Sequence, residues 1–94
     1  MLYWIIYDIS NDKARGRVAE KCKNYGLSRV QKSSFLGFLS PNKAEMLALE
    51  FDELLSEGDA VFIIPTCRSC AKEKIIVGHL DEEKVRERDF YVVE

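Results

Sequence analysis

The sequence has no long hydrophobic run and few cysteines, and each absence excludes a class of protein. Its longest uncharged apolar stretch covers residues 1–7, far short of the ~20 residues that span a bilayer, so no association with a membrane is expected. No basic segment precedes this stretch and Asp8 follows it directly, which argues against a secretory signal peptide. Three cysteines, an odd number, do not suit a disulfide framework and indicate a reducing cytoplasm.

Glycine and proline are also scarce, with five and two among 94 residues. With 47% hydrophobic and 32% charged residues, the composition is typical of an ordered globular protein. The length suits a single domain over residues 1–94. There is no phosphate-binding loop, nucleotide-binding fingerprint, Ser/His/Asp triad or Cys/His pair with catalytic spacing, so the common catalytic motifs are absent from the sequence.

An excess of basic residues is missing as well, but the charges are unevenly distributed. The net charge of −2 excludes a uniformly basic nucleic-acid-binding protein. Residues 13–32 nevertheless carry seven basic side chains and one acidic one, a formal charge of +6, whereas residues 33–60 carry one basic and six acidic side chains, a charge of −5. The first segment is therefore suited to an anion that the second would repel.

The first half of the chain predicts a strand, a helix and a hairpin. Residues 2–9 are apolar at both parities, as in a strand buried on both faces. A helix is predicted from the turn at residues 10–12 to about Tyr25, where Gly26 stops it. Residues 29–39 are extended and predict a short, irregular hairpin.

The next segment predicts a second helix that begins at Pro41, with Ser40 as its cap. Its apolar residues fall on one stripe. They are Ala44, Leu47, Ala48, Phe51, Leu54 and Leu55.

The last part of the chain predicts strands at 60–64, 75–77 and 90–93, with residues 79–89 as a charged connector. The resulting order, β-α-β-β-α-β with additional C-terminal strands, predicts an α+β fold of the ferredoxin-like sandwich type. Two helices cover only one face of such a sheet, yet strands 2–9 and 60–64 are apolar on both faces. We therefore expect a homodimer in which two sheets pack face to face about a two-fold axis.

Asp8 is a candidate metal ligand because a carboxylate at the end of an apolar strand requires a partner. It either caps the following turn or helix, or points at the two-fold axis of the dimer. In the second case two carboxylates would converge on a divalent cation, for which Mg²⁺ or Mn²⁺ is suited.

Arg15, Arg17 and Arg29 are candidates for binding phosphates, with Tyr7 and Phe35 near them. Arg15 and Arg17 lie about 200° apart on a helix, so they do not form one stripe. The alternative is a basic helix face that is merely solvated.

Cys67 and Cys70 have C-x-x-C spacing, but the sequence holds one histidine, His79, which leaves a structural zinc site incomplete. A thioredoxin-like role requires the pair to open a helix after a strand, and here the pair is predicted between two strands. Turn cysteines without a special function are the simplest interpretation, with a dimer-bridging metal or a labile disulfide as alternatives. Cys22 falls on the apolar side of the first helix and is predicted to be a core residue.

Three segments together resemble the Cas2 family, the small CRISPR-associated nucleases of the adaptation module. They are LYWIIYDIS at 2–10, RGRVA at 15–19 and GLSRVQKSSFLG at 26–37. The similarity continues through the acidic second helix, residues 59–65 and residues 74–78. The cysteine pair is not part of the family's core motif. The family's hairpin commonly has polar or acidic residues beside Gly37, where this chain has Leu36 and Phe38.

The resemblance implies a ferredoxin-like homodimer whose C-terminal strands pack on the partner subunit. It implies a role in acquiring spacers together with the CRISPR integrase, with duplex DNA as a ligand, and many members are metal-dependent endonucleases on RNA or duplex DNA. By matching position, Asp8 is the metal and catalytic residue. The implied substrate-binding residues are Tyr7, Arg15, Arg17, Arg29, Ser33 and Phe35.

Two functions remain open from the sequence. As an enzyme, the dimer would hydrolyse phosphodiester bonds with Mg²⁺ between two Asp8 side chains, the arginines on phosphates, and Tyr7 or Phe35 stacked on a base. As a scaffold, the dimer would hold duplex DNA and bridge integrase subunits without any chemistry. Asp8 discriminates between the two, because only the enzyme requires it.

Overall fold

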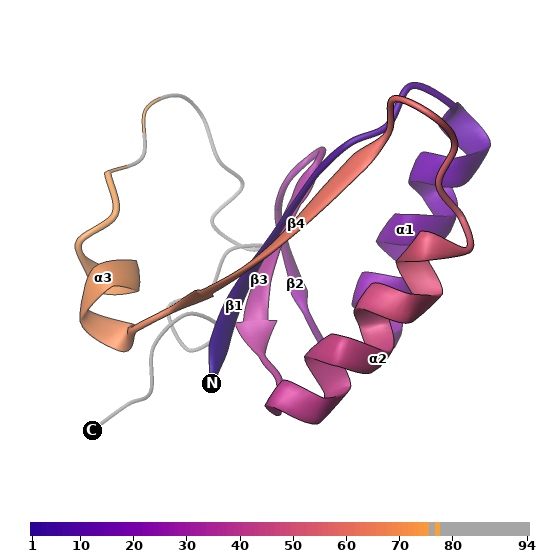
Figure 1. Cartoon of the computed structure of the whole chain (residues 1–94). Coiled ribbons are helices and arrows are strands. Elements are labelled where there is room, and N and C mark those ends of the chain that lie inside the picture. Colours follow the sequence, from indigo (N-terminus) through magenta and orange to yellow (C-terminus); the bar gives the residue numbers. More distant parts are fainter. Residues whose placement is uncertain (76, 78–94) are drawn as a thin grey trace.

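The described part of the chain, residues 1–75 and 77, has the element order β-α-β-β-α-β followed by a short helix. In this computed structural model the strands lie in the order β2-β3-β1-β4, and every neighbouring pair is antiparallel (Figure 1). The arrangement confirms the predicted ferredoxin-like α+β fold. The elements are β1 (Leu2–Asp8), α1 (Asp12–Asn24), β2 (Ser28–Gln31), β3 (Ser34–Phe38), α2 (Pro41–Asp52), β4 (Ala60–Thr66) and α3 (Arg68–Lys72).

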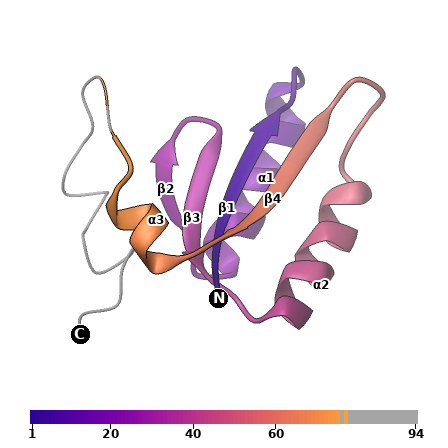
Figure 2. The ribbon, with the colours of Figure 1, turned by 60° about the vertical axis from the view of Figure 1, so that its left-hand side comes forward.

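The main core lies between the sheet and the two long helices. Helices α1 and α2 lie together on one face of the sheet, and α3 lies on the other side (Figures 1 and 2). Alternate residues of β1 point into this core, as the period of a strand requires. The buried side chains of the core include Tyr3, Ile5, Tyr7, Val18, Cys22, Phe35, Leu47 and Phe51.

Both long helices begin where the sequence predicts and α1 ends as predicted, but α2 ends at Asp52, before Leu54 and Leu55, which the sequence analysis had placed in the helix. The Asn11 side chain caps α1 by accepting a hydrogen bond from the Ala14 N–H at 2.9 Å, and Gly26 follows the helix with a φ of 81°. Ser40 caps α2 by accepting from the Lys43 N–H at 3.1 Å. Of the stripe predicted on α2, Ala48 alone is exposed.

A polar contact also ties α1 to α2. Lys21 Nζ lies 2.8 Å from Glu50 Oε1, and the Tyr25 hydroxyl donates to the same carboxylate. The hydrogen bonds from Lys21 and then Tyr25 lower the pKa of Glu50, while the bond to Glu50 raises the pKa of Tyr25. The contacts of Lys21 and Tyr25 with Glu50 therefore join the basic helix α1 to the acidic helix α2.

The other face of the sheet is apolar, and the described residues cover only part of it. Ala71 of α3 packs with Leu2 and Leu36 in a second, smaller core. Beside it, Ile6 is 40% exposed and Phe62 is 60% exposed. The sequence prediction that both faces of β1 and β4 are apolar is therefore confirmed.

Two predictions for the end of the chain differ from the structure. The C-x-x-C segment forms the start of α3, which the sequence analysis missed because five residues show no helical period. Ile75 and Val77 are not in a strand. After α3 both residues lie on the same side of the sheet as that helix, where they line a cavity with Trp4 and Ile6.

The predicted connector at 79–89 and strand at 90–93, like His79, lie outside the described residues. Within the described part of the chain, no helix combines the length and the apolar character that a membrane span needs.

Candidate nucleic-acid interface

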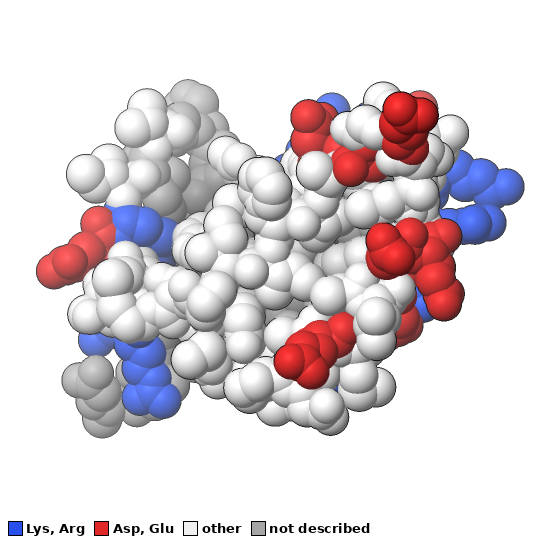
Figure 3. Space-filling model, in the orientation of Figure 1, with Lys and Arg blue, Asp and Glu red and all other residues white. Residues whose placement is uncertain are grey.

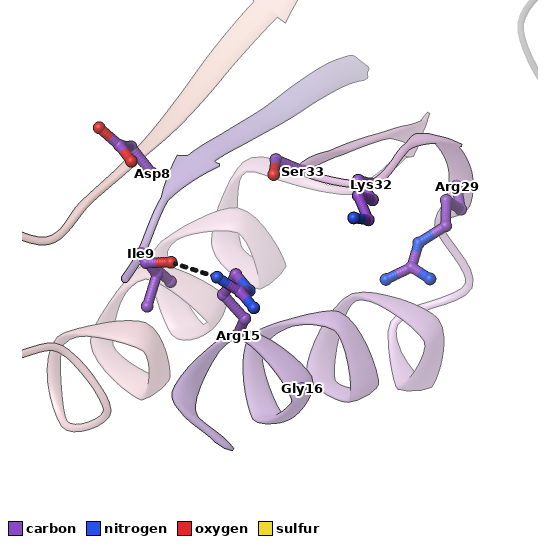
Figure 4. A pocket seen from close by; sticks show the side chains of 7 residues that line it. All are labelled: Asp8, Ile9, Arg15, Gly16, Arg29, Lys32 and Ser33. Carbon is purple, nitrogen blue, oxygen red and sulfur yellow. Dashed lines mark hydrogen bonds between the residues drawn. The ribbon is translucent and has the colours of Figure 1, made fainter. Parts of the chain in front are cut away.

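A cavity of about 410 Å³ lies between α1 and the β2–β3 hairpin. Three of its side chains are cationic and come from separate parts of the basic segment (Figure 4). Ile9 and Gly16 complete one wall, and Asp8 lies at the rim. The cationic residues are Arg15, Arg29 and Lys32, and Ser33 lies beside them. Lys32 was not singled out from the sequence, although it belongs to the +6 segment.

Arg15 is held at the N-terminal end of α1. Its Nη1 donates to the Ile9 carbonyl at 3.2 Å, and its guanidinium forms an ion pair with Asp12 one helical turn away. The side chain remains 42% exposed. Arg15 is therefore fixed in orientation and still reaches solvent in the cavity.

Arg29 lies on an aromatic base. Its guanidinium carbon is 5.1 Å from the centre of the Phe35 ring, a distance typical of cation–π contacts. The rings of Phe35 and Tyr7 are 6.4 Å apart and inclined by 22°. Arg29 Nε is buried and has no hydrogen-bond partner among the described residues. The aromatic pair thus directs the cationic head of Arg29 toward the cavity.

Tyr7 also fixes the turn of the hairpin. Its hydroxyl donates to the Lys32 carbonyl at 3.0 Å, and its backbone N–H donates to the Ser33 carbonyl at 3.0 Å. Burial raises the pKa of Tyr7, and the neighbouring Arg29 opposes that effect. The tyrosine is therefore a neutral support of the cavity wall.

The burial of these rings contradicts one expectation from the sequence. Phe35 is fully buried and Tyr7 nearly so, because both point into the core from paired central strands. Neither ring presents a face on which a base could stack. Their contact with Arg29 indicates a supporting position beneath the cavity instead.

Arg17 and Asp8 lie apart from the cationic group. Arg17 is exposed on α1 and does not line the cavity. Asp8 is the last residue of β1, opposite Ala60, and its carboxylate points away from Arg15, Lys32 and Arg29 (Figure 4). The helix cap that the sequence offered as one role for Asp8 is Asn11.

The donor set around Asp8 is small. Within residues 1–75 and 77, no group of three or more His, Cys, Asp or Glu side chains is placed to hold a metal. Asp8 is exposed and makes no hydrogen bond or ion pair to another described residue. One chain therefore provides a single free carboxylate, which fits a hard cation only as part of a larger set of oxygen ligands.

The surface around β4 has a different character. Figure 3 shows a broad uncharged region at its centre, with acidic side chains gathered on the side of α2. Three basic side chains, by contrast, converge on the cavity.

A ferredoxin-like sheet with a cationic cavity between its first helix and its hairpin defines a small α+β protein with a candidate anion-binding site. Residues 1–74 match the family described as CRISPR associated protein Cas2. The chain is 39% identical over 89 residues to a protein from Archaeoglobus fulgidus named CRISPR-associated endoribonuclease Cas2 1, covering 94% of this chain and 95% of that one. The chain therefore belongs to the Cas2 family.

Solved structures have the same fold. A hypothetical protein from Thermus thermophilus is 33% identical, with a TM-score of 0.71 over 85% of this chain and 93% of that one. Cas2 from Streptococcus pyogenes, at 21% identity, has a TM-score of 0.74 over 83% of this chain and the whole of that one. At that identity the second likeness concerns the fold alone.

Proposed function

We propose that the chain is a CRISPR adaptation protein, a nucleic-acid-binding homodimer that acts in the cytoplasm as a metal-dependent endonuclease on RNA or duplex DNA. The observation that carries the proposal is the convergence of Arg15, Arg29 and Lys32 on one cavity with Asp8 at its rim. The name of the Archaeoglobus fulgidus relative, an endoribonuclease, supports the reaction class.

The cavity is suited to a phosphate backbone. Guanidinium and ammonium groups bind phosphate oxygens without regard to base sequence. Arg29 is held over Phe35 and Arg15 is tied to the Ile9 carbonyl, so both cations are positioned before a ligand arrives. Arg17, exposed on the same helix, extends the basic surface beyond the cavity.

The homodimer would form through the face of the sheet opposite α1 and α2, which α3 covers only in part. Ile6, Phe62 and Ile64 are between 40% and 60% exposed there, which leaves an apolar surface to be covered. Strand alternation places Asp8 on this same face, two residues beyond Ile6. A sheet-to-sheet dimer would therefore bury the apolar surface and place one Asp8 from each protomer at the shared face.

The two Asp8 side chains would together hold Mg²⁺ or Mn²⁺, because exposed carboxylate oxygens without protein partners suit a hard cation. Such an ion, when bound, polarises a phosphate and lowers the pKa of a bound water. The chain's own contribution is to bind and orient the phosphates through Arg15, Arg29 and Lys32. The described residues that line the cavity include no histidine and no glutamate. Lys32 is the one lysine among them, so it is the one candidate for a general base beside Asp8.

A non-catalytic scaffold is the second candidate. The single carboxylate per chain favours it, as does the direction of Asp8 away from the three cations. In this case the same cavity would hold duplex DNA and the dimer would bridge CRISPR integrase subunits.

A cleavage assay separates the two functions. Purified protein is incubated with labelled single-stranded RNA and with duplex DNA, in Mg²⁺, in Mn²⁺ or in chelator. The endonuclease predicts products with at least one ion and none in chelator. Duplex binding without cleavage under every condition would contradict the endonuclease and favour the scaffold.

A further inference from the structure

The two exposed cysteines at the start of α3 are arranged as a reactive pair. The sequence analysis placed them between two strands, but in the structure they follow β4 and open a helix. Cys67 Sγ accepts the Cys70 N–H at 3.2 Å and lies 3.3 Å from Ser69 Oγ. Both thiols are exposed and unpaired, whereas Cys22, the third, is buried in the core.

The surroundings give the two thiols different roles. A hydrogen bond from the Cys70 thiol, followed by one from Ser69, lowers the pKa of Cys67 to about 7. The same contact raises the pKa of Cys70, and Glu73 adds to that effect. At neutral pH a substantial fraction of Cys67 is therefore thiolate, whereas Cys70 keeps its proton. Burial raises the pKa of Cys22 to about 12, so this thiol is unreactive.

We propose that Cys67 and Cys70 form a reversible disulfide by exchange with low-molecular-weight disulfides, Cys67 as the attacking thiol and Cys70 as the resolving thiol. The Cys67 thiolate attacks one sulfur of the small disulfide, so that a mixed disulfide forms and one small thiolate leaves. Cys70 then gives its proton to solvent and attacks Cys67 Sγ, releasing the second small thiol. The two protein thiols are oxidised and the small disulfide is reduced to two thiols, so atoms and electrons balance.

The site is separate from the cationic cavity and does not depend on nucleic-acid binding. It adjoins the second core, because Ala71, the residue after Cys70, packs on Leu2 and Leu36. A disulfide would join the residue that follows β4 to the first turn of α3, and so fix the helix on the apolar face. Disulfides of cytoplasmic proteins, when present, are usually transient and catalytic or redox-sensing.

Mass spectrometry of the reduced full chain, incubated with glutathione disulfide at pH 7, tests the proposal. The wild type should lose two hydrogen atoms and retain no adduct. Cys70→Ser should accumulate one glutathione on Cys67, because the resolving thiol is absent. Cys67→Ser should react several-fold more slowly than Cys70→Ser, and Cys22 should stay unmodified in the folded chain.

The pH dependence of alkylation provides the second measurement. In Cys70→Ser the thiol hydrogen bond is replaced by a hydroxyl, so Cys67 should react with iodoacetamide about threefold faster at pH 7 than an ordinary exposed thiol. This figure combines a larger thiolate fraction with the weaker nucleophilicity of a low-pKa thiol. Ser69→Ala should move the midpoint of the profile to higher pH, since it removes one contact of Cys67 Sγ.

Equal adduct formation in Cys67→Ser and Cys70→Ser would overturn the assignment of roles. Disulfides that link two chains in place of the intramolecular disulfide would overturn the proposal itself. Circular dichroism identifies any variant that fails to fold, and because all three substituted residues are exposed we expect native spectra.

Discussion

Arg29 links the buried layer of the sheet to the cavity. Its guanidinium rests on Phe35, which is stacked on Tyr7, and both rings belong to the core. A long side chain can pack along apolar surface while its charged head reaches solvent. In the proposed function, the two aromatic residues would therefore contribute to phosphate binding by positioning the arginine.

Arg29→Ala should weaken duplex binding with little dependence on base sequence. Each phosphate contact that is lost lowers the salt slope of the binding constant by roughly one unit. Fluorescence anisotropy at several salt concentrations measures the slope. Lys43→Ala is the matched control, because it removes one positive charge from α2 outside the cavity. An equal change of slope in both variants would mean that net charge, and not the cavity, determines binding.

The candidate residues could be found from the sequence, but not their arrangement. The charge contrast and the family resemblance identified Arg15 and Arg29, which do line the cavity. Whether Phe35 is accessible depends on which parity of β3 faces the helices, and the register Ile5↔Phe35 decides it. An irregular hairpin with a bulge after Arg29 leaves that register undetermined by pattern alone.

Among the elements, β3 approaches Leu27, in the connection between α1 and β2, so closely that it requires a glycine. A Cβ at Gly37 would lie 2.8 Å from Leu27 Cδ2 and 3.2 Å from Leu27 Cα. The second of these atoms is backbone and cannot turn aside. At Gly16, within α1, an added Cβ would have no atom within 4 Å, so this position does not require glycine.

Gly37→Ala should lower the free energy of unfolding by about 1–3 kcal/mol, the usual effect of overpacking. Gly16→Ala should raise it by about 0.5–1 kcal/mol, since alanine favours a helix interior. Urea unfolding followed by circular dichroism, at one fixed protein concentration, measures both changes. A stabilised Gly37→Ala would show that Leu27 can move away and that the close approach is not a constraint.

Elements with local signals were predicted well. Ser40, Pro41 and Gly26 mark helix ends by their own chemistry, and the structure confirms each position. Helix α3 has only five residues, too few to show a helical period in the sequence. The β-branched residues from Ile75 onward suggested a strand, but the described residues there do not form one. Strand formation depends on a free edge within reach, which a local pattern does not specify.

At the scale of the whole molecule, the two faces of the sheet differ in what covers them. Helices α1 and α2 bury one face, and α3 covers only a part of the other (Figure 2). The sequence predicted this imbalance, because both parities of β1 and β4 are apolar while the long helices number two. The exposed apolar surface is the basis of the proposed dimer.

Light scattering at micromolar concentration should give about twice the chain mass for the wild type. Phe62→Asp should give the mass of one chain, because it places a charge in the proposed interface on β4. Leu49→Asp is the matched control: Leu49 is 70% exposed on α2, on the other side of the sheet, and its replacement should leave the mass unchanged. A dimer that survives Phe62→Asp, or one disrupted by Leu49→Asp, would contradict the sheet-to-sheet arrangement.

The most direct test of the central claim is cleavage by Asp8→Asn beside the wild type, in saturating Mg²⁺ or Mn²⁺ and in chelator. Asparagine keeps the shape of the side chain but loses the charge that attracts a hard cation. Asp52→Asn, an exposed change at the end of α2, is the control. The account predicts that Asp8→Asn binds duplex DNA at least as tightly as the wild type, remains a dimer and no longer cleaves, while Asp52→Asn cleaves normally. Full metal-dependent cleavage by carefully purified Asp8→Asn would contradict the account.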